Sequence, residues 1–212
     1  MSIAQNLISI KDSLPQNVTL VAVSKTKPVA DLMEAYNAGQ RIFGENKIQE
    51  MTEKWEQMPK DIQWHMIGHV QTNKVKFMAE YVTLIHGIDS LKLLEEINKQ
   101  ALKHNRIIDC LLQMYIANED TKFGLDETEL KEILDSGSFK SLKNIRVTGL
   151  MGMATFTENT IQIKKEFQYL KTIFDRYPAF STLSMGMSGD YGLAIDCGST
   201  MVRIGSSIFG TR

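Results

Sequence analysis

The stretch VTLVAVSKTKPVADLMEAYNAG, residues 18–39, contains one complete strand-and-helix unit. Its first residues are almost all apolar and rich in β-branched side chains, which is typical of a strand buried on both faces. Pro28 then begins a helical pattern and Gly39 ends it, matching the usual places of proline and glycine at helix ends. A buried strand followed at once by a helix predicts a parallel sheet that is covered by helices.

The same alternation continues along the whole chain, after a first amphipathic helix. Eight strands are expected, at residues 18–24, 41–43, 62–67, 82–85, 107–116, 146–151, 182–187 and 200–204. Each strand with its helix is close to the size of a strand-plus-crossover unit, ~30 residues. No Pro-, Gly- or Ser-rich linker interrupts the series. We therefore expect one domain over residues 1–212.

Two architectures satisfy this pattern: an open, doubly wound sheet and a closed (β/α)8 barrel. The even number of strands and their apolar character favour the barrel, and 212 residues lies near the lower limit of about 200 for such barrels. An open sheet usually has polar edge strands, and only the short second strand is a candidate. The predicted fold class is α/β, a single (β/α)8 TIM barrel with an extra N-terminal helix.

The overall composition excludes several classes of protein. Hydrophobic residues make up 43% and charged residues 23% of the chain, which is ordinary for a globular protein. A formal net charge of -1 argues against a dedicated nucleic-acid-binding protein. No apolar run approaches the roughly 20 residues of a membrane span, and the N-terminus lacks the pattern of a signal peptide. We expect neither a nucleic acid nor a membrane as partner.

The two cysteines, Cys110 and Cys197, have no Cys or His nearby at metal-binding spacing. A disulfide framework and a metal site are therefore not expected, and the reducing cytoplasm is the expected location. Cys110 lies on a predicted strand and is interpreted as a buried, inert thiol. The methionines of GLMGMAT and LSMGMS are interpreted as core and pocket wall.

In a barrel, functional groups lie where strands end and the following loops begin. The loops after the seventh and eighth strands stand out, because barrels often bind phosphate there. Ser188 and Gly189 precede a short predicted helix, and Gly205, Ser206 and Ser207 follow the eighth strand. Either loop alone could be an ordinary turn with a serine cap. Their combination predicts a phosphate-binding site.

Lys25 and Arg203 are charged residues in apolar surroundings. Lys25 ends a strand of apolar and small residues, and partial desolvation would lower the pKa of its amine, so that it can attack an aldehyde. Arg203 interrupts the apolar strand MVRIG and needs a partner, either a carboxylate such as Glu45 or Asp190, or a ligand acceptor. Together with the phosphate loops they suit pyridoxal 5′-phosphate (PLP), which has an aldehyde, a ring nitrogen and a phosphate.

Two histidines are weaker candidates. A histidine on an apolar strand, such as His65, is more often a hydrogen-bonded core residue than a reactive one. His69 follows the third strand in a loop, where a histidine usually faces solvent. The residues alone assign His65 no chemical role.

Five segments give the sequence a family resemblance: VAVSKTKP, IFGENKIQE, WHMIGHVQTNK, GLMGMAT and LSMGMSGDYGLAIDCGSTMVRIGSSIFG. Together they resemble the pyridoxal phosphate homeostasis proteins, the YggS/PROSC family, and they span residues 21–210 in that family's order. The resemblance implies a fold type III PLP-binding barrel, similar to the N-terminal domain of alanine racemase.

The resemblance also implies roles for individual residues. Lys25 resembles the lysine that holds PLP covalently as an aldimine, Asn46 a pocket residue near the cofactor ring, and Arg203 the arginine that faces the pyridine nitrogen. The residues that resemble the phosphate cradle are Ser188, Gly205 and Ser206. Gly189-Asp190-Tyr191 departs from the family, where many members carry a bulkier apolar residue after the aspartate. The resemblance assigns no chemical role to His65 or to the segment 118–124.

These features favour a non-catalytic protein that holds PLP in cofactor homeostasis, by storage, by scavenging or by delivery to apo PLP-dependent enzymes. We expect it to be a monomer. The alternative is a PLP-dependent amino-acid racemase with weak activity, which needs an acid/base group on each face of its substrate. Two-domain racemases take the second group from a tyrosine of another domain, which these 212 residues do not include, although His65 or Tyr191 could replace it. An aldolase acting on a sugar phosphate would use Lys25 but leaves Arg203 unexplained.

Overall fold

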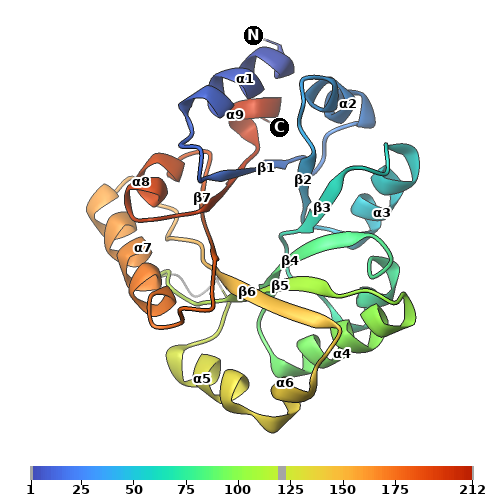
Figure 1. Ribbon diagram of the computed structural model, residues 1–212. Coiled ribbons are helices and arrows are strands. Elements are labelled where there is room, and N and C mark those ends of the chain that lie inside the picture. Colours follow the sequence, from blue (N-terminus) through green and yellow to red (C-terminus); the bar gives the residue numbers. More distant parts are fainter. Residues whose placement is uncertain (1, 119–122, 212) are drawn as a thin grey trace.

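The computed structural model describes residues 2–118 and 123–211. Its eight strands form a closed parallel barrel in chain order, and β1 pairs with β8 to close it. The strands are β1 (Thr19–Val23), β2 (Ile42–Glu45), β3 (Gln63–Met66), β4 (Val82–Ile88), β5 (Ile108–Gln113), β6 (Ile145–Met151), β7 (Thr182–Met187) and β8 (Met201–Ile204). The helices lie outside the strands (Figure 1). The predicted barrel is confirmed, and the open sheet is excluded.

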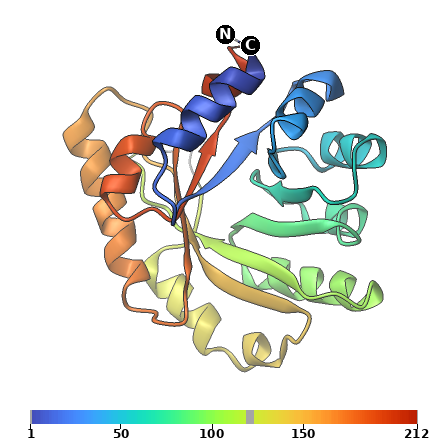
Figure 2. The same ribbon diagram turned by 45° about the horizontal axis from the view of Figure 1, so that its top comes forward.

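Helices connect the strands and cover the barrel. They are α1 (Ile3–Ser13), α2 (Val29–Asn37), α3 (Ile48–Gln57), the 3₁₀ helix η1 (Thr72–Phe77), α4 (Leu91–Lys103), α5 (Glu127–Asp135), α6 (Gly137–Ser141), α7 (Thr160–Phe174), α8 (Tyr191–Asp196) and α9 (Ser206–Phe209). The predicted N-terminal helix is α1, and a capping box of Ser2 and Gln5 begins it. It lies beside α9 at the two chain ends, where Asn6 Nδ2 donates to the carbonyl of Ile208 at 3.1 Å (Figure 2).

Apolar side chains pack on both faces of the sheet, inside the barrel and between the barrel and the helices. On β1, Leu20 and Ala22 pack outward into the large core beneath the helices, whereas Val21 packs into a smaller cluster with Leu84 and Leu111. This period of two is the alternation of side chains along a strand. Because both faces are buried, the strands read as continuous apolar runs in the sequence.

Closure of the barrel brings the first and last strands together. In the register, Val21 of β1 lies opposite Arg203 of β8, and Arg203 in turn lies opposite Met187 of β7. The loops after β1, β7 and β8 therefore leave the barrel at neighbouring positions, although most of the chain separates β1 from the other two strands. The ends of these strands are where the sequence predicts the site.

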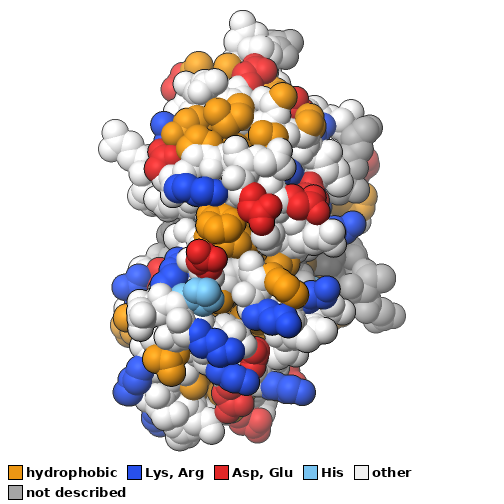
Figure 3. Space-filling model, turned by 90° about the vertical axis from the view of Figure 1, so that its right-hand side faces the viewer, with side chains coloured by type: hydrophobic (Ala, Val, Ile, Leu, Met, Phe, Trp, Pro, Cys, Tyr) orange, Lys and Arg blue, Asp and Glu red, His pale blue; other side chains and the backbone are white. Residues whose placement is uncertain are grey.

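Charges of both signs are distributed over the surface. On the face shown in Figure 3, acidic side chains are interspersed among basic ones, and the basic ones are more frequent in the lower half. This mixture agrees with the formal net charge of -1. Within the described part of the chain, no helix is both long enough and apolar enough to span a membrane.

Candidate functional site

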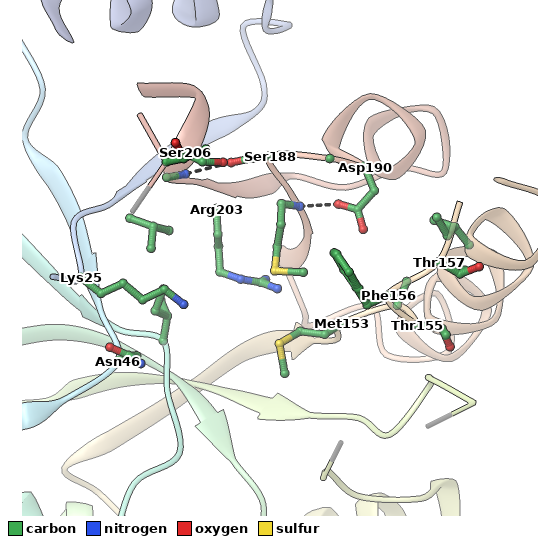
Figure 4. Close-up of a pocket in the computed structure, with 18 of the residues that line it drawn as sticks. Lys25, Asn46, Met153, Thr155, Phe156, Thr157, Ser188, Asp190, Arg203 and Ser206 are labelled. Carbon is green, nitrogen blue, oxygen red and sulfur yellow. Dashed lines mark hydrogen bonds between the residues drawn. The ribbon is translucent and has the colours of Figure 1, made fainter. Parts of the chain in front are cut away.

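A cavity of about 580 Å³ lies at the ends of β1, β2, β6, β7 and β8. All six residues predicted to bind the cofactor line this one cavity: Lys25, Asn46, Ser188, Arg203, Gly205 and Ser206. The side chains of Lys25 and Arg203 extend into the same space, and the two serines lie together at its edge (Figure 4). The loops therefore meet as the barrel rule predicts.

Lys25 lies in a tight turn directly after β1 and is half-buried. Asn46, which follows β2, lies on the same wall of the cavity (Figure 4). The next residue after the lysine, Thr26, has a φ of 65°, which is rare for a β-branched residue. Its backbone N–H donates to Glu50 Oε1 at 2.5 Å. Contacts from another element therefore hold the turn that carries Lys25 in an unfavourable backbone conformation.

A buried ionic cluster lies beneath this turn. Lys54 Nζ donates to Glu45 Oε1 at 2.7 Å, to Glu50 Oε1 at 2.7 Å and to the carbonyl of Ser24 at 2.8 Å. Ser24 Oγ also donates to Glu45 Oε1 at 2.6 Å. Burial raises the pKa of Glu45, and the hydrogen bond and charge of Lys54 oppose that shift. The cluster contacts the backbone on both sides of Lys25, at Ser24 and at Thr26.

Arg203 is buried in the barrel, with 4% of its surface exposed. Its Nη1 donates to the Ser184 carbonyl at 3.0 Å and to Ser184 Oγ at 2.7 Å, and its Nη2 donates to the Gly152 carbonyl at 3.2 Å. Glu45, one of the two carboxylates considered as its partner, pairs with Lys54 instead. Burial lowers the pKa of Arg203 to about 10, opposed by the charge of Asp190, so the guanidinium stays charged near neutral pH.

The loops after β7 and β8 are joined by a hydrogen bond. Ser188 Oγ accepts the backbone N–H of Gly205 at 3.1 Å, and Asp190 Oδ1 accepts the N–H of Met187 at 2.6 Å (Figure 4). A Cβ added at Gly205 would lie 3.1 Å from the carbonyl oxygen of Val23, so the backbones approach closely there. The predicted phosphate cradle is thus a compact pair of loops, in which the Gly205 N–H faces Ser188.

Residues outside the predicted set also line the cavity. Lys27, expected at the loop edge, lies on its wall, and its Nζ donates to the carbonyls of Phe209 at 3.0 Å and Thr211 at 3.2 Å. Met153 and Met187 form apolar wall, as interpreted from the sequence, whereas Met151 is buried in the core. Phe156 is 92% exposed at the outer side of the same cavity.

Two functional-site neighbours were missed by sequence reasoning, namely Ser184 and His86. Both are buried, and they connect Arg203 to His65 by hydrogen bonds. The interpretation of His65 as a hydrogen-bonded core residue is confirmed. His69 is mostly exposed, and its Nδ1 lies 3.3 Å from Asp89 Oδ2. Of the segment 118–124, whose role the sequence left open, residues 119–122 lie outside the described residues.

The chemistry of the cavity follows from these groups. An amine, a fixed guanidinium and serine hydroxyls suit an anionic ligand that also carries an electrophilic carbon and a hydrogen-bond acceptor. In the described ranges, 2–118 and 123–211, no group of three or more His, Cys, Asp and Glu side chains is arranged to hold a metal ion.

The chain is similar to proteins of known families over its full length. The family model "Alanine racemase, N-terminal domain" matches residues 1–212. The pyridoxal phosphate homeostasis protein of Aquifex aeolicus is 39% identical over 199 residues, covering 91% of this chain and 86% of that protein. The protein of the same name from Escherichia coli K12 is 37% identical over 231 residues, covering 99% of this chain and 97% of that protein.

Solved structures agree with these relatives. PipY of Synechococcus elongatus PCC7942, solved with PLP bound, superimposes with a TM-score of 0.90 at 34% sequence identity and covers 99% of this chain and 100% of that chain. An alanine racemase of Clostridium difficile 630 superimposes with a TM-score of 0.79 at 15% identity, covering 100% of this chain and 60% of that chain. The racemase shares the fold of the barrel.

Proposed function

Because this chain belongs to the family of the alanine racemase N-terminal domain, we propose that it binds PLP and takes part in PLP homeostasis. The observation that carries this proposal is the convergence of Lys25, Arg203 and the loop pair Ser188–Gly205 on one cavity. Lys25 follows β1 and Arg203 lies on β8, and barrel closure brings these two strands together.

The residues of the cavity fit PLP by their chemistry. Bound PLP supplies an aldehyde that amines attack, a dianionic phosphate and a ring nitrogen that accepts a hydrogen bond. We propose that Lys25 Nζ bonds covalently to the aldehyde carbon with loss of one water, and that Asn46 lies beside the ring. Arg203 donates to the ring nitrogen, and the hydroxyls of Ser188 and Ser206 hold the phosphate. Gly205 contributes through its N–H, which orients the Ser188 hydroxyl.

We propose that the protein holds PLP rather than turning over amino acids. A guanidinium with a pKa near 10 donates a hydrogen bond without giving up its proton, which keeps the ring nitrogen unprotonated and the ring a poorer electron sink. His65 and Tyr191, the two replacements considered for a second acid/base group, are not among the residues that line the cavity. His65 is buried against His86 instead. These placements favour the carrier over the racemase.

The covalent site is tested by borohydride reduction of the protein loaded with PLP. We expect one pyridoxyl group on the peptide that contains Lys25, together with a visible absorbance band that reduction removes. Lys25→Ala should abolish both, and Lys27→Ala, which changes the neighbouring amine of the same cavity, should retain the label. A label found mainly on Lys27 or Lys74 would contradict the proposed site.

The absence of turnover is tested by chiral analysis of alanine and serine after long incubation with the loaded protein. Racemisation, transamination or decarboxylation at an ordinary turnover of about 1–10³ s⁻¹ would defeat the carrier proposal. Delivery is tested by mixing loaded protein with an apo PLP-dependent enzyme and following the return of its activity. Failure of that transfer leaves storage or scavenging and removes delivery.

We also propose that residues 1–212 act as one domain, as a monomer and in the cytoplasm. Light scattering of the purified protein measures the molar mass, and a value near twice the 24.0 kDa of the chain would contradict the monomer.

A further inference from the structure

A continuous chain of buried polar groups crosses the interior of the barrel. Arg203 Nη1 contacts Ser184 Oγ at 2.7 Å, His86 Nδ1 lies 3.0 Å from the same oxygen, and His86 Nε2 lies 3.1 Å from His65 Nδ1. These residues come from β8, β7, β4 and β3, and none has more than 4% of its surface exposed. Four polar side chains in an apolar barrel are costly unless each is satisfied by its neighbours.

The chemistry of arginine sets the direction of this chain. A guanidinium only donates, so Ser184 Oγ accepts from Arg203 and keeps its own proton for another acceptor. The ring nitrogen of His86 is at the right distance, and a proton on that nitrogen would leave the buried Ser184 O–H without an acceptor among its described contacts. His86 therefore accepts at Nδ1 and donates from Nε2 to His65 Nδ1.

Both histidines are consequently neutral in the folded protein. Burial lowers the pKa of His65 to about 3 and that of His86 well below its ordinary value, and the charge of Arg203 lowers the latter further. A protonated His86 ring would place a second positive charge close to the Arg203 guanidinium, with only Ser184 between them. The buried environment disfavours that arrangement. The geometry and the charge state agree on one arrangement of protons.

The two ends of this row of hydrogen-bonded side chains, Arg203 and His65, lie in different cavities. Arg203 lines the PLP cavity, whereas His65 lines a separate cavity of about 550 Å³ whose wall includes the first residues of β1 and β7, Thr19 and Thr182. Ser184 engages Nη1 of Arg203 twice, through its carbonyl and its hydroxyl. This double contact fixes the rotation of the guanidinium, and with it the direction of the N–H groups that face the cavity.

We propose that Ser184, His86 and His65 are positioning residues that hold the Arg203 guanidinium in a single orientation for the ring nitrogen of PLP. This inference rests on the proposed function for the identity of the ligand, whereas the hydrogen bonds that link the four residues join protein groups only. The three residues act through Arg203 and do not contact the cofactor in this assignment.

The proton positions in the hydrogen-bonded residues are tested first without PLP. Long-range ¹H–¹⁵N correlation spectra of the histidine rings give them, and His65→Asn and His86→Asn assign the signals. We expect both rings to be neutral, with the proton on Nε2, at neutral pH. A proton on Nδ1 of His86, or an imidazolium ring, would overturn the inference whether or not the protein binds PLP.

The effect on the cofactor is tested by PLP affinity and by the visible spectrum of the loaded protein as a function of pH. Ser184→Ala should weaken PLP binding about tenfold, the typical effect of losing a hydrogen bond to a charged group. It should also change the pH dependence of the visible band, because the ring nitrogen loses its fixed donor. The matched control is Ser199→Ala, a buried serine whose Oγ donates to the Met185 carbonyl at 2.8 Å, away from Arg203.

A pair of His86 variants keeps the test decisive if Ser184→Ala fails to fold. His86→Asn retains an acceptor near the position of Nδ1 and should keep the wild-type spectrum. His86→Leu removes that acceptor and should behave like Ser184→Ala. Equal spectra and affinities for all of these variants and the Ser199→Ala control would overturn the positioning role. Failure of the unmodified protein to take up PLP would instead refute the proposed function.

Discussion

Ser188 joins the two loops that form the predicted phosphate cradle. Its hydroxyl oxygen accepts the Gly205 N–H at 3.1 Å, so a protein–protein hydrogen bond holds the two loops together. A phosphate can accept from the hydroxyls of Ser188 and Ser206 and from backbone N–H groups. Because several donors share the charge, the loss of one hydroxyl leaves the others in place.

We expect pyridoxal, which lacks the phosphate, to bind far more weakly than PLP. Hydrogen bonds to a charged group are worth about 1.5–3 kcal/mol each, and pyridoxal loses all of them. Ser188→Ala should weaken PLP binding about tenfold or less, since it loses one hydroxyl. Equilibrium titration followed by the visible band measures each affinity. Ser207→Ala, at an exposed serine that does not line the cavity, is the control. Equal affinities for pyridoxal and PLP would contradict the cradle.

Single residues differ in how well the sequence reveals them. The place of Lys25 and Arg203 in the cavity could be predicted, because each puts a charge within or after an apolar strand. That departure is visible in one segment. Ser184 and His86 could not, because each is satisfied by a residue from a distant strand, 98 positions apart in the chain. The partner that makes a buried polar residue stable is a property of the closed barrel. A single segment does not contain it.

The elements around the site leave little space between β1 and β8. A Cβ at Gly205 would lie 3.1 Å from the Val23 carbonyl oxygen and 3.2 Å from the Val23 Cβ. These distances require the backbone or the β-branched side chain of Val23 to move. A Cβ added at Gly189, in the neighbouring loop, would meet no atom within 4 Å.

Gly205→Ala should therefore destabilise the protein by about 1–3 kcal/mol, the usual range for overpacking. It should also weaken PLP binding, because the added Cβ would push the loop after β8 away from Val23 of β1 and so displace the predicted phosphate cradle. Gly189→Ala is the matched control and should leave the free energy of unfolding unchanged. Urea unfolding and PLP titration of both variants check this. Loss of PLP binding in Gly189→Ala at unchanged stability would show that the ligand needs that space. Wild-type stability in Gly205→Ala would contradict the close approach.

Helix α3 supplies Lys54, whose ammonium group pairs with the carboxylates of Glu45 and Glu50 beneath the turn that carries Lys25. Lys54→Met should destabilise the protein by about 3–5 kcal/mol, because Glu45 would remain buried without its partner. The double variant Lys54→Met/Glu45→Gln should recover part of that loss, since the buried charge is then gone. Chemical unfolding of the single and double variants measures the coupling. Additive effects of the two substitutions would contradict the ion pair.

The same cluster contacts the backbone beside Lys25, so Lys54→Met should also slow the covalent uptake of PLP. Borohydride trapping at timed intervals measures that rate. Lys99→Met, at an exposed lysine of α4 whose Nζ lies 3.8 Å from Glu96 Oε2, is the control. Uptake at the wild-type rate in the folded Lys54→Met variant would separate the cluster from the placement of Lys25.

Prediction succeeds for elements whose pattern is complete within one segment. Strand β7 was expected at residues 182–187 and is found at Thr182–Met187. The sequence predicts that β4 ends at residue 85, but the strand continues to Ile88, which pairs with Leu112 of β5, and Gly87 fits there against the Gly68 carbonyl. The helix expected after the third strand is the short 3₁₀ helix η1. Val75 of η1 is buried, and so is Met78, which directly follows η1. The two are three residues apart, the spacing of a 3₁₀ turn.

At the scale of the whole molecule, the buried histidines make stability depend on pH. His65 has a pKa of about 3 when folded and 6.5 as its ordinary value, so below 6.5 the unfolded chain binds a proton that the folded chain does not. The free energy of unfolding therefore falls as the pH falls from about 6.5 toward 3, by about 1.4 kcal/mol per pH unit for such a site. The raised pKa of Glu45 acts in the opposite direction, since its contribution is lost as the pH rises.

His65→Asn, which retains an acceptor for His86, should reduce this acid sensitivity by about 2 kcal/mol between pH 7 and pH 5. Urea unfolding at both pH values, compared with wild type, isolates the histidine from Glu45. His104→Gln, at an exposed histidine beyond α4, should leave the pH dependence unchanged. An identical pH dependence in wild type and His65→Asn would contradict the buried neutral state.

The pairing of β1 with β8 also has a consequence for biosynthesis. A ribosome releases the chain from its N-terminus at roughly 5–20 residues per second, so the amine of Lys25 emerges long before Ser188 and Gly205 have been synthesised. In the proposed assignment, a nascent chain then carries the amine that would bond to PLP but lacks the loops that would hold the phosphate. If the proposed site is correct, selectivity for a phosphorylated aldehyde begins only when β8 pairs with β1. In the proposed assignment, a truncated translation product would carry Lys25 without the phosphate loops, and covalent loading at Lys25 would mark the chains that have been completed.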